Sequence, residues 1–130
     1  MPLFTVTMKA GRTADEKDAI SRAIHAASVK AGYPNDDMFQ RFLCLEQADL
    51  RVDLHYPGLP KPRTEKMLMI EVLVSSGTDV EKKTRLLAAL VEALDGAGTD
   101  PNDIMVFFGE IDRASSSFGG GRLAPPVVTT

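Results

Sequence analysis

Thr13-Ala-Asp-Glu16 and Thr78-Asp-Val-Glu81 decide the fold, because they begin a series of short motifs that the chain carries twice. Each places a glutamate three residues after a threonine, which is the pattern of a capping box at a helix N-terminus. Three matched pairs in one order indicate a duplicated unit. The two later pairs, which bring the separations to 65, 66 and 67 residues, are Ala31-Gly32 with Ala97-Gly98 and Pro34-Asn-Asp36 with Pro101-Asn-Asp103.

The sequence around these motifs predicts a strand, a helix and a strand in each half of the chain. A glycine follows each predicted helix and suits a left-handed C-terminal stop. The expected elements are a strand at 3–8, a helix at 13–31 and a strand at 39–45, then a strand at 67–75, a helix at 78–97 and a strand at 104–111.

These elements predict one α/β (α+β) domain over residues 1–130. We expect two β-α-β repeats at about 2–50 and 67–115. A proline-rich connector at 53–64 joins them, and a glycine-rich loop and tail at 115–130 follow the second repeat.

Each expected helix carries a single apolar stripe, which can cover one face of a sheet. The strands are apolar on both faces, since only Glu71 is charged in residues 67–74. Because two helices cannot cover both faces of four strands, we expect the second face to pack against other copies in a closed homo-oligomer. The stripes comprise Ile20, Ala23, Ile24 and Ala27 in the first helix, and Leu86, Leu87, Leu90, Val91 and Leu94 in the second.

Composition argues against several classes of protein. The 130 residues carry a net charge of −3, which gives no reason to expect a nucleic-acid partner. Since no apolar stretch reaches the length of a membrane span and the N-terminus lacks a signal-peptide pattern, we expect no membrane partner. The single cysteine, Cys44, fits a reducing cytoplasm. With only His25 and His55, we expect neither a metal nor another cofactor, and we interpret Cys44 and His25 as structural.

Pro2 follows the initiator Met1 directly, and a predicted strand begins immediately after it. A penultimate residue this small normally allows removal of the methionine, which leaves the proline with a free secondary amine. An α-amino group titrates at roughly 8, so modest burial or a nearby cation brings it into the range of a base at neutral pH. The alternative is that Pro2 is only the first residue of a strand, where its missing N–H costs nothing.

An N-terminal proline on a duplicated β-α-β unit resembles the tautomerase superfamily. Pro2 and Gly11-Arg12-Thr13 are similar to the opening of 4-oxalocrotonate tautomerase, while residues 34–37 and 117–122 resemble the fused branch of malonate semialdehyde decarboxylase. The resemblance implies a four-stranded sheet with two helices on one face, assembled as a trimer. It also implies that Pro2 is the acid/base catalyst, once per chain because the second repeat begins with Met67-Leu68.

The same resemblance implies roles for four more residues. Arg12 and Arg41 would bind a substrate carboxylate, which suits a guanidinium fork. Asp37 would work with the proline and a water, and Phe118 would wall the pocket. Each has a plainer interpretation: a turn arginine, an edge-strand arginine facing solvent, a turn acid like the adjacent Asp36, and a packing anchor for the tail.

The chain departs from the decarboxylase branch at one point. That branch carries an Arg-x-Arg pair just before the second helix, where this chain has Ser75-Ser-Gly-Thr78. Decarboxylation is therefore not supported, although Arg63 in the connector could substitute. The leading hypothesis is a tautomerase that interconverts the keto and enol forms of a small anionic acid. The alternatives are a decarboxylase or hydratase that uses Pro2 with Asp37, and a non-catalytic trimeric binding protein.

Overall fold

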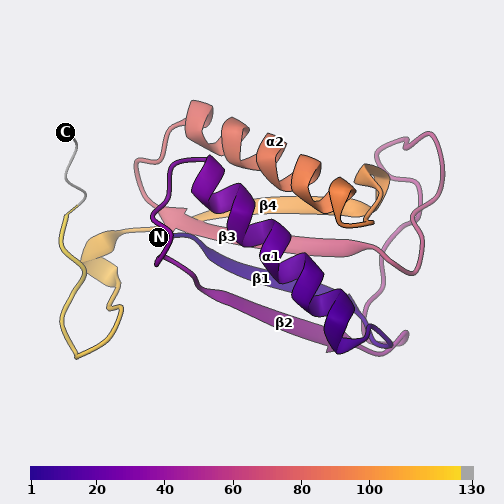
Figure 1. Cartoon of the computed structure of the whole chain (residues 1–130), viewed down its shortest axis with the longest axis horizontal. Helices are drawn as coiled ribbons and strands as arrows, with labels where there is room; N and C mark the ends of the chain where they lie inside the picture. The colour runs from indigo at the N-terminus through magenta and orange to yellow at the C-terminus, as the bar shows by residue number, and fades with distance from the viewer. Residues whose placement is uncertain (127–130) are drawn as a thin grey trace.

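The computed structural model describes residues 1–126, and the last part of the expected tail, 127–130, lies outside the described residues. Every predicted strand and helix is present, with its ends within about two residues of the expected bounds (Figure 1). In chain order the elements are β1 (Leu3–Lys9), α1 (Ala14–Lys30), β2 (Gln40–Leu45), β3 (Leu68–Ser75), α2 (Val80–Gly96), the 3-10 helix η1 (Pro101–Asp103), β4 (Ile104–Ile111) and the 3-10 helix η2 (Arg113–Ser115).

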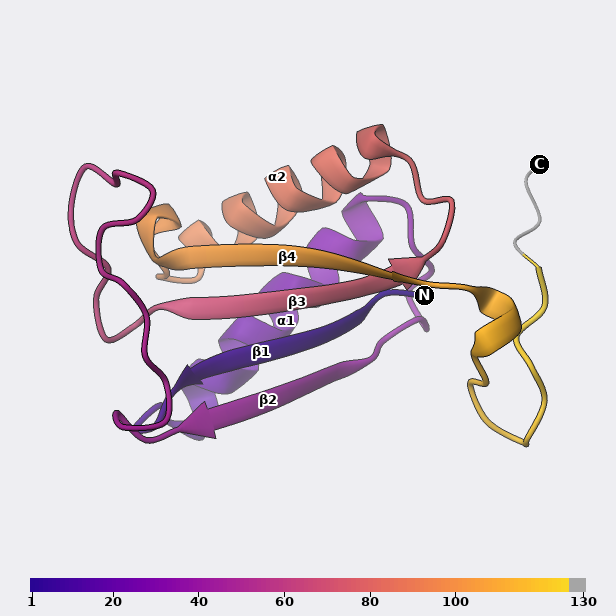
Figure 2. The same ribbon diagram turned by 180° about the vertical axis from the view of Figure 1, so that it is seen from behind.

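The strands form one sheet in the order β2-β1-β3-β4. The outer pairs, β1 with β2 and β3 with β4, are parallel, whereas the central pair of β1 and β3 is antiparallel. Both helices lie against the same face of the sheet, as the front and back views show (Figures 1 and 2). This β-α-β-β-α-β arrangement confirms the predicted fold class.

The hydrophobic core lies between the helices and the sheet. In β3 the alternation is complete: Leu68, Ile70, Val72 and Val74 are buried, while Glu71 on the opposite face is exposed. Period-two alternation of this kind is what a strand with one covered face requires.

The helices contribute their predicted stripes to this core with one exception. All four stripe residues of α1 are buried, and so are Leu86, Leu90 and Leu94 of α2. Leu87, however, is 40% exposed, so its assignment to the stripe is wrong. Ala89 is buried instead, because it lies one turn after Leu86 on the same side of the helix.

The other face of the sheet is left open by the described residues, and it carries large apolar side chains. Leu43 in β2 and Phe107 in β4 are 44% and 57% exposed. Apolar side chains arranged along a whole sheet face are typical of an interface between subunits.

The two helices begin differently, although their sequences predict the same capping box. At α1, Thr13 Oγ1 accepts from the Glu16 amide and Glu16 Oε1 accepts from the Thr13 amide, so this capping box is confirmed. At α2 the N-cap is Asp79, whose carboxylate accepts from the Lys82 amide. The predicted cap at Thr78 is wrong because its hydroxyl donates to the Ser75 carbonyl instead.

This correction changes the alignment of the two repeats by one residue. With Thr13 matched to Asp79, the separation is 66 residues at the start of the helices. Gly11 then matches Gly77, and both have positive φ, 115° and 90°. The helix C-termini show the same separation, because Gly32 and Gly98 occupy equivalent places after the two C-caps.

The connector lies at the end of the sheet opposite the N-terminus (Figures 1 and 2). It is held there by Asp103, a buried carboxylate that accepts from the Thr64 amide at 2.7 Å and from the Thr64 hydroxyl at 2.5 Å. Lys61 adds an ion pair with Asp100 at 2.5 Å. Among the described residues, no helix is both long enough and apolar enough to cross a membrane.

The end of α2 provides a test of the backbone, because two glycines there differ in conformation. Gly98 has φ of 100°, whereas Gly96 is helical, and a Cβ at either position would meet nothing within 4 Å. Gly98→Ala should therefore destabilise the fold by ~1 kcal/mol through left-handed strain alone. Gly96→Ala should stabilise it by about 0.5 kcal/mol, because alanine loses less backbone entropy in a helix. Urea unfolding midpoints measure both, and changes of the same sign would contradict this account.

Candidate functional site

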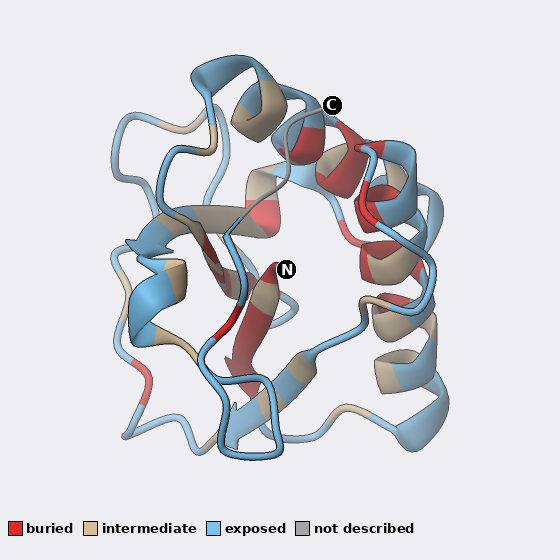
Figure 3. Ribbon diagram, turned by 90° about the vertical axis from the view of Figure 1, so that its left-hand side faces the viewer, coloured by how far each residue is buried: buried red, intermediate tan, exposed pale blue. Residues whose placement is uncertain are grey.

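The site is at the end of the sheet where β1 and β2 begin and β3 and β4 end. Figure 3 looks onto this end, with the N-terminus near its centre and the C-terminal loop in front. A hollow of about 270 Å³ opens here, and we call it the N-terminal chamber. Its lining comes from the first residue, from both ends of the second repeat's strands and from the C-terminal loop: Met1, Leu73, Ser75, Ile111, Ser115, Ser116, Ser117 and Phe118.

The N-terminal nitrogen lies beside a carboxylate. The ammonium group of Met1 is 3.1 Å from Asp37 Oδ2, and both side chains are largely shielded from solvent. Pro2 is fully buried at the start of β1. Because three bonds separate the two backbone nitrogens, the Pro2 nitrogen lies at most roughly 7 Å from the same carboxylate oxygen. Pro2 and Asp37 are therefore brought together by the fold.

Asp37 has one satisfied and one unsatisfied oxygen. Its amide donates to the Pro34 carbonyl, which fixes the turn that leads into β2. Its Oδ1 atom is buried and has no hydrogen-bond partner among the described residues. A buried carboxylate oxygen without a donor is costly, so it is suited to bind a water or a polar group of a ligand. The neighbouring Asp36 is exposed.

Tyr33 lies against the same carboxylate, and the sequence analysis did not single it out. Its ring is buried beneath the Lys82 ammonium, which lies 4.1 Å from the ring centroid. Burial raises the pKa of the Tyr33 hydroxyl, and the negative charge of Asp37 raises this pKa further. The available signal was its place immediately after the Gly32 helix stop, where an apolar contact with the helix is common.

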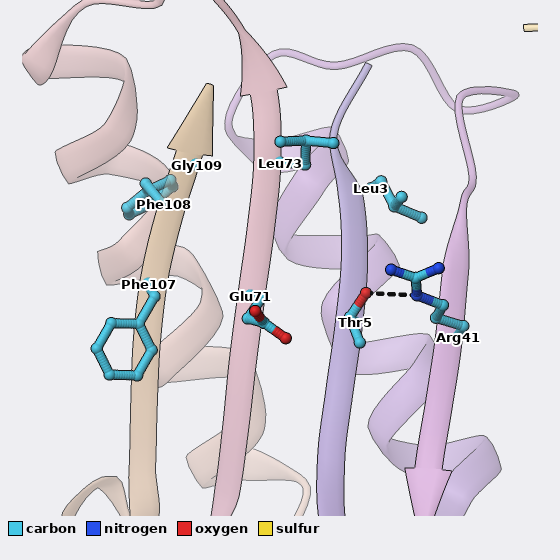
Figure 4. A pocket seen from close by; sticks show the side chains of 8 residues that line it. All are labelled: Leu3, Thr5, Arg41, Glu71, Leu73, Phe107, Phe108 and Gly109. Atoms are coloured by element: carbon cyan, nitrogen blue, oxygen red, sulfur yellow. Dashed lines mark hydrogen bonds between the residues drawn. The ribbon is translucent and has the colours of Figure 1, made fainter. Parts of the chain in front are cut away.

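Arg41 lies on the open face of the sheet, in a second hollow of about 300 Å³. Its Nε donates to Thr5 Oγ1 at 2.7 Å, across the register in which Thr5 pairs with Arg41. Figure 4 shows the guanidinium directed along β1 toward Leu3, the residue after Pro2. Leu73 lines both this hollow and the N-terminal chamber, so the two are adjacent.

Phe118 lines the chamber from the C-terminal loop. The loop is closed by a hydrogen bond from the Ala124 amide to the Ser116 carbonyl at 2.7 Å. On its other side the Phe118 ring is 5.2 Å from the Arg113 guanidinium, which donates to the Pro125 carbonyl. These contacts hold the aromatic ring at the chamber wall.

The structure does not bring Arg12 or Arg63 to this chamber. Arg12 follows the far end of β1, where it donates to the Lys66 carbonyl, so the strand separates it from Pro2 by roughly 20 Å. Arg63 lies in the connector and donates to the Asp53 carbonyl at 2.6 Å. Within one chain the chamber therefore joins Pro2 with Asp37 and Phe118, has Arg41 as its neighbour, and excludes both of the other arginines.

Two β-α-β repeats around one sheet, with a chamber at the first residue, define an α/β fold of the tautomerase type. A family model described as "Tautomerase enzyme" matches residues 37–119. The chain belongs to this tautomerase family, and members of the tautomerase superfamily are enzymes. The matched region contains Asp37, Arg41 and Phe118 but starts after Pro2 and Arg12. No curated protein sequence matches the chain.

Solved structures support the same assignment. FG41 malonate semialdehyde decarboxylase, inhibited by 3-bromopropiolate, is 27% identical with a TM-score of 0.84, over 92% of this chain and 91% of that chain. A malonate semialdehyde decarboxylase with decarboxylase and hydratase activities is 28% identical with a TM-score of 0.84, over 92% of each chain. A fused 4-OT that forms a symmetric trimer is 25% identical with a TM-score of 0.76, over 94% and 95%. The resemblance inferred from the sequence is thus confirmed, and these relatives support a homo-oligomer.

Tyr33 offers a direct test of the electrostatics around Asp37. In a Tyr56→Phe background, Tyr33 is the only tyrosine, and the chain has no tryptophan. Asp37→Asn should lower the pKa of Tyr33, because it removes the repulsion between the phenolate and the carboxylate while burial still acts. The measurement is the absorbance at 295 nm as a function of pH. Asp36→Asn is the matched control, and an equal shift in both variants would show that the effect is not local to Asp37.

Proposed function

We propose that the protein is an isomerase that interconverts the keto and enol forms of a small 2-oxo carboxylic acid, with Pro2 as its acid/base after removal of Met1. The observation that carries the proposal is the chamber at the first residue, with the Asp37 carboxylate 3.1 Å from the N-terminal nitrogen. Membership of the tautomerase family supports this class of reaction.

The proton transfer needs one group that serves in both directions. The neutral Pro2 amine takes the proton of the enol hydroxyl, and the oxygen keeps the bonding electrons to form the carbonyl. The carbon–carbon double-bond electrons then take a proton from the prolinium to form the new C–H bond, so no atom or electron is gained or lost. Asp37 would favour the protonated amine between the two steps, because opposite charges at this separation attract.

Substrate binding would use a cation outside the chamber. Arg41 is in the adjoining hollow, and its Nε bond to Thr5 leaves the terminal guanidinium nitrogens available for a carboxylate. Arg12 could contribute to the same site only from another copy of the chain, because β1 separates it from Pro2 of its own chain. Phe118 would wall the pocket and keep water from the amine.

The decisive experiment follows the ultraviolet absorbance of phenylpyruvate and of a 2-hydroxydienoate with the processed protein. Pro2→Ala should lower kcat/KM at least about a hundredfold, the scale of losing a general acid/base. Pro60→Ala, in the exposed part of the connector, is the control and should leave activity unchanged. An inactive wild type, or a Pro2→Ala variant that matches it, would reject the proposal in favour of the lyase or the non-catalytic binding protein.

A lyase that uses Pro2 with Asp37 is the second candidate. The buried, unpartnered Oδ1 of Asp37 favours it, since such an atom is suited to hold and deprotonate a water. The similar malonate semialdehyde decarboxylase with decarboxylase and hydratase activities supports it as well.

The two candidates differ in what Asp37→Asn should do. If the protein is a lyase, carbon dioxide release from a 3-oxo acid, measured as bicarbonate in a coupled assay, should fall at least about a hundredfold in Asp37→Asn and remain in Asp36→Asn. Absence of carbon dioxide release and of hydration by the wild type would eliminate this candidate, whatever the isomerase assay shows.

A further inference from the structure

We propose that the N-terminal chamber binds the uncharged end of its ligand, so that the substrate is a monocarboxylate with an apolar or hydroxyl-bearing tail rather than a dicarboxylate. This inference rests on the proposed function, because it assigns the substrate class of the same site. Arg41 would bind the single carboxylate in the adjoining hollow, and the tail would lie against Phe118.

The lining of the chamber carries hydroxyl and apolar groups. Among the described residues, its charged group is the N-terminal ammonium, whose partner is Asp37, and none of its side chains is cationic. Four serines supply hydroxyls, and the rest of the wall is apolar. The serines are Ser75, Ser115, Ser116 and Ser117.

Cationic side chains near this end of the sheet have other partners. Arg113 lies over the Phe118 ring and donates to the Pro125 carbonyl. Lys82 covers the ring of Tyr33, and Lys83 pairs with Glu110 at 3.4 Å. A second carboxylate in the chamber would thus find hydroxyl donors and the like charge of Asp37, but no counter-ion from these groups.

The duplication supplies an internal comparison. With the two repeats matched at a separation of 66 residues, Lys9 corresponds to Ser75 and Arg12 to Thr78. Lys9 and Arg12 line a hollow at the opposite end of the sheet. The chamber end therefore has hydroxyl groups at both positions where the other end has cations, on an equivalent backbone.

Arg41 supplies the charge that a single carboxylate needs. It lies on the side of the chamber opposite the C-terminal loop, with Leu73 between the two hollows. A ligand that spans them would place its carboxylate at the guanidinium and its tail at Phe118, and would pass the start of β1. This order of charges selects against a molecule with an anion at each end.

The test compares two unreactive six-carbon dienes that differ only at one end, hexa-2,4-dienoate and hexa-2,4-dienedioate. Isothermal titration calorimetry of the processed wild-type protein should show that the monocarboxylate binds at least about tenfold more tightly. Ser75→Lys, which introduces the lysine of the other repeat, should raise affinity for the dicarboxylate about tenfold and change that for the monocarboxylate little. Ser76→Lys is the matched control, because Ser76 is exposed and lies outside the lining.

Each outcome decides the inference separately from the proposed function. Equal or tighter binding of the dicarboxylate by the wild type would overturn it, and so would failure of both probes to bind. The wild-type comparison needs no variant, so a Ser75→Lys protein that does not fold leaves the test intact. A wild type that isomerises a dicarboxylate through Pro2 would retain the proposed function and refute the substrate class. Selective binding of the monocarboxylate without Pro2-dependent turnover would do the reverse.

Discussion

Antiparallel pairing of β1 with β3 at the centre of the sheet is the constraint on which the site depends. Leu3 pairs with Leu73 at one end of this pair, and Met8 pairs with Leu68 at the other. Each end of the sheet therefore combines the start of one repeat with the finish of the other. The chamber takes Met1 from the first repeat and Ser75 and Ile111 from the second, so a single β-α-β unit would not form it.

The same pairing allows the two ends of the sheet to serve different purposes. Both repeats carry Pro-Asn-Asp before their last strand. At the connector end, Asp103 is buried and is used in full by the amide and hydroxyl of Thr64. At the chamber end, Asp36 is exposed, and the next residue is a second acid, Asp37, in the place of Ile104. One additional carboxylate at an equivalent turn thus separates a structural end from an end suited to chemistry.

The fold could be predicted from the sequence because its signals are local. Helix periodicity, strand alternation and the glycine stops each depend on neighbouring residues, and these predictions were confirmed to within about two residues. The N-cap of α2 was missed because Thr78 and Asp79 are both good caps, and the choice depends on whether the Thr78 hydroxyl binds the Ser75 carbonyl.

The site was less predictable, since sequence spacing does not tell at which end of a strand a residue lies relative to the chain's other elements. Arg12 is ten residues from Pro2 in the sequence, yet the extended β1 carries it to the opposite end. Arg41 approaches the chamber only because parallel pairing aligns it with Thr5. Aligning the repeats at the correct separation would have revealed Ser75 in the place of Lys9, but that separation depends on the cap of α2.

The ion pair between the N-terminus and Asp37 connects the maturation of the chain to both candidate reactions. While Met1 is present, its ammonium satisfies Asp37 Oδ2, and Met1 itself forms part of the chamber lining. Removal of this residue enlarges the chamber and leaves a buried carboxylate whose nearest replacement amine, on Pro2, is set back along the chain. A carboxylate in that position needs a new donor, because an unpaired buried charge costs several kcal/mol. Either a water or the hydroxyl of an enol can fill the gap between Asp37 and Pro2, and the choice between these two occupants is what separates a lyase from an isomerase on this fold.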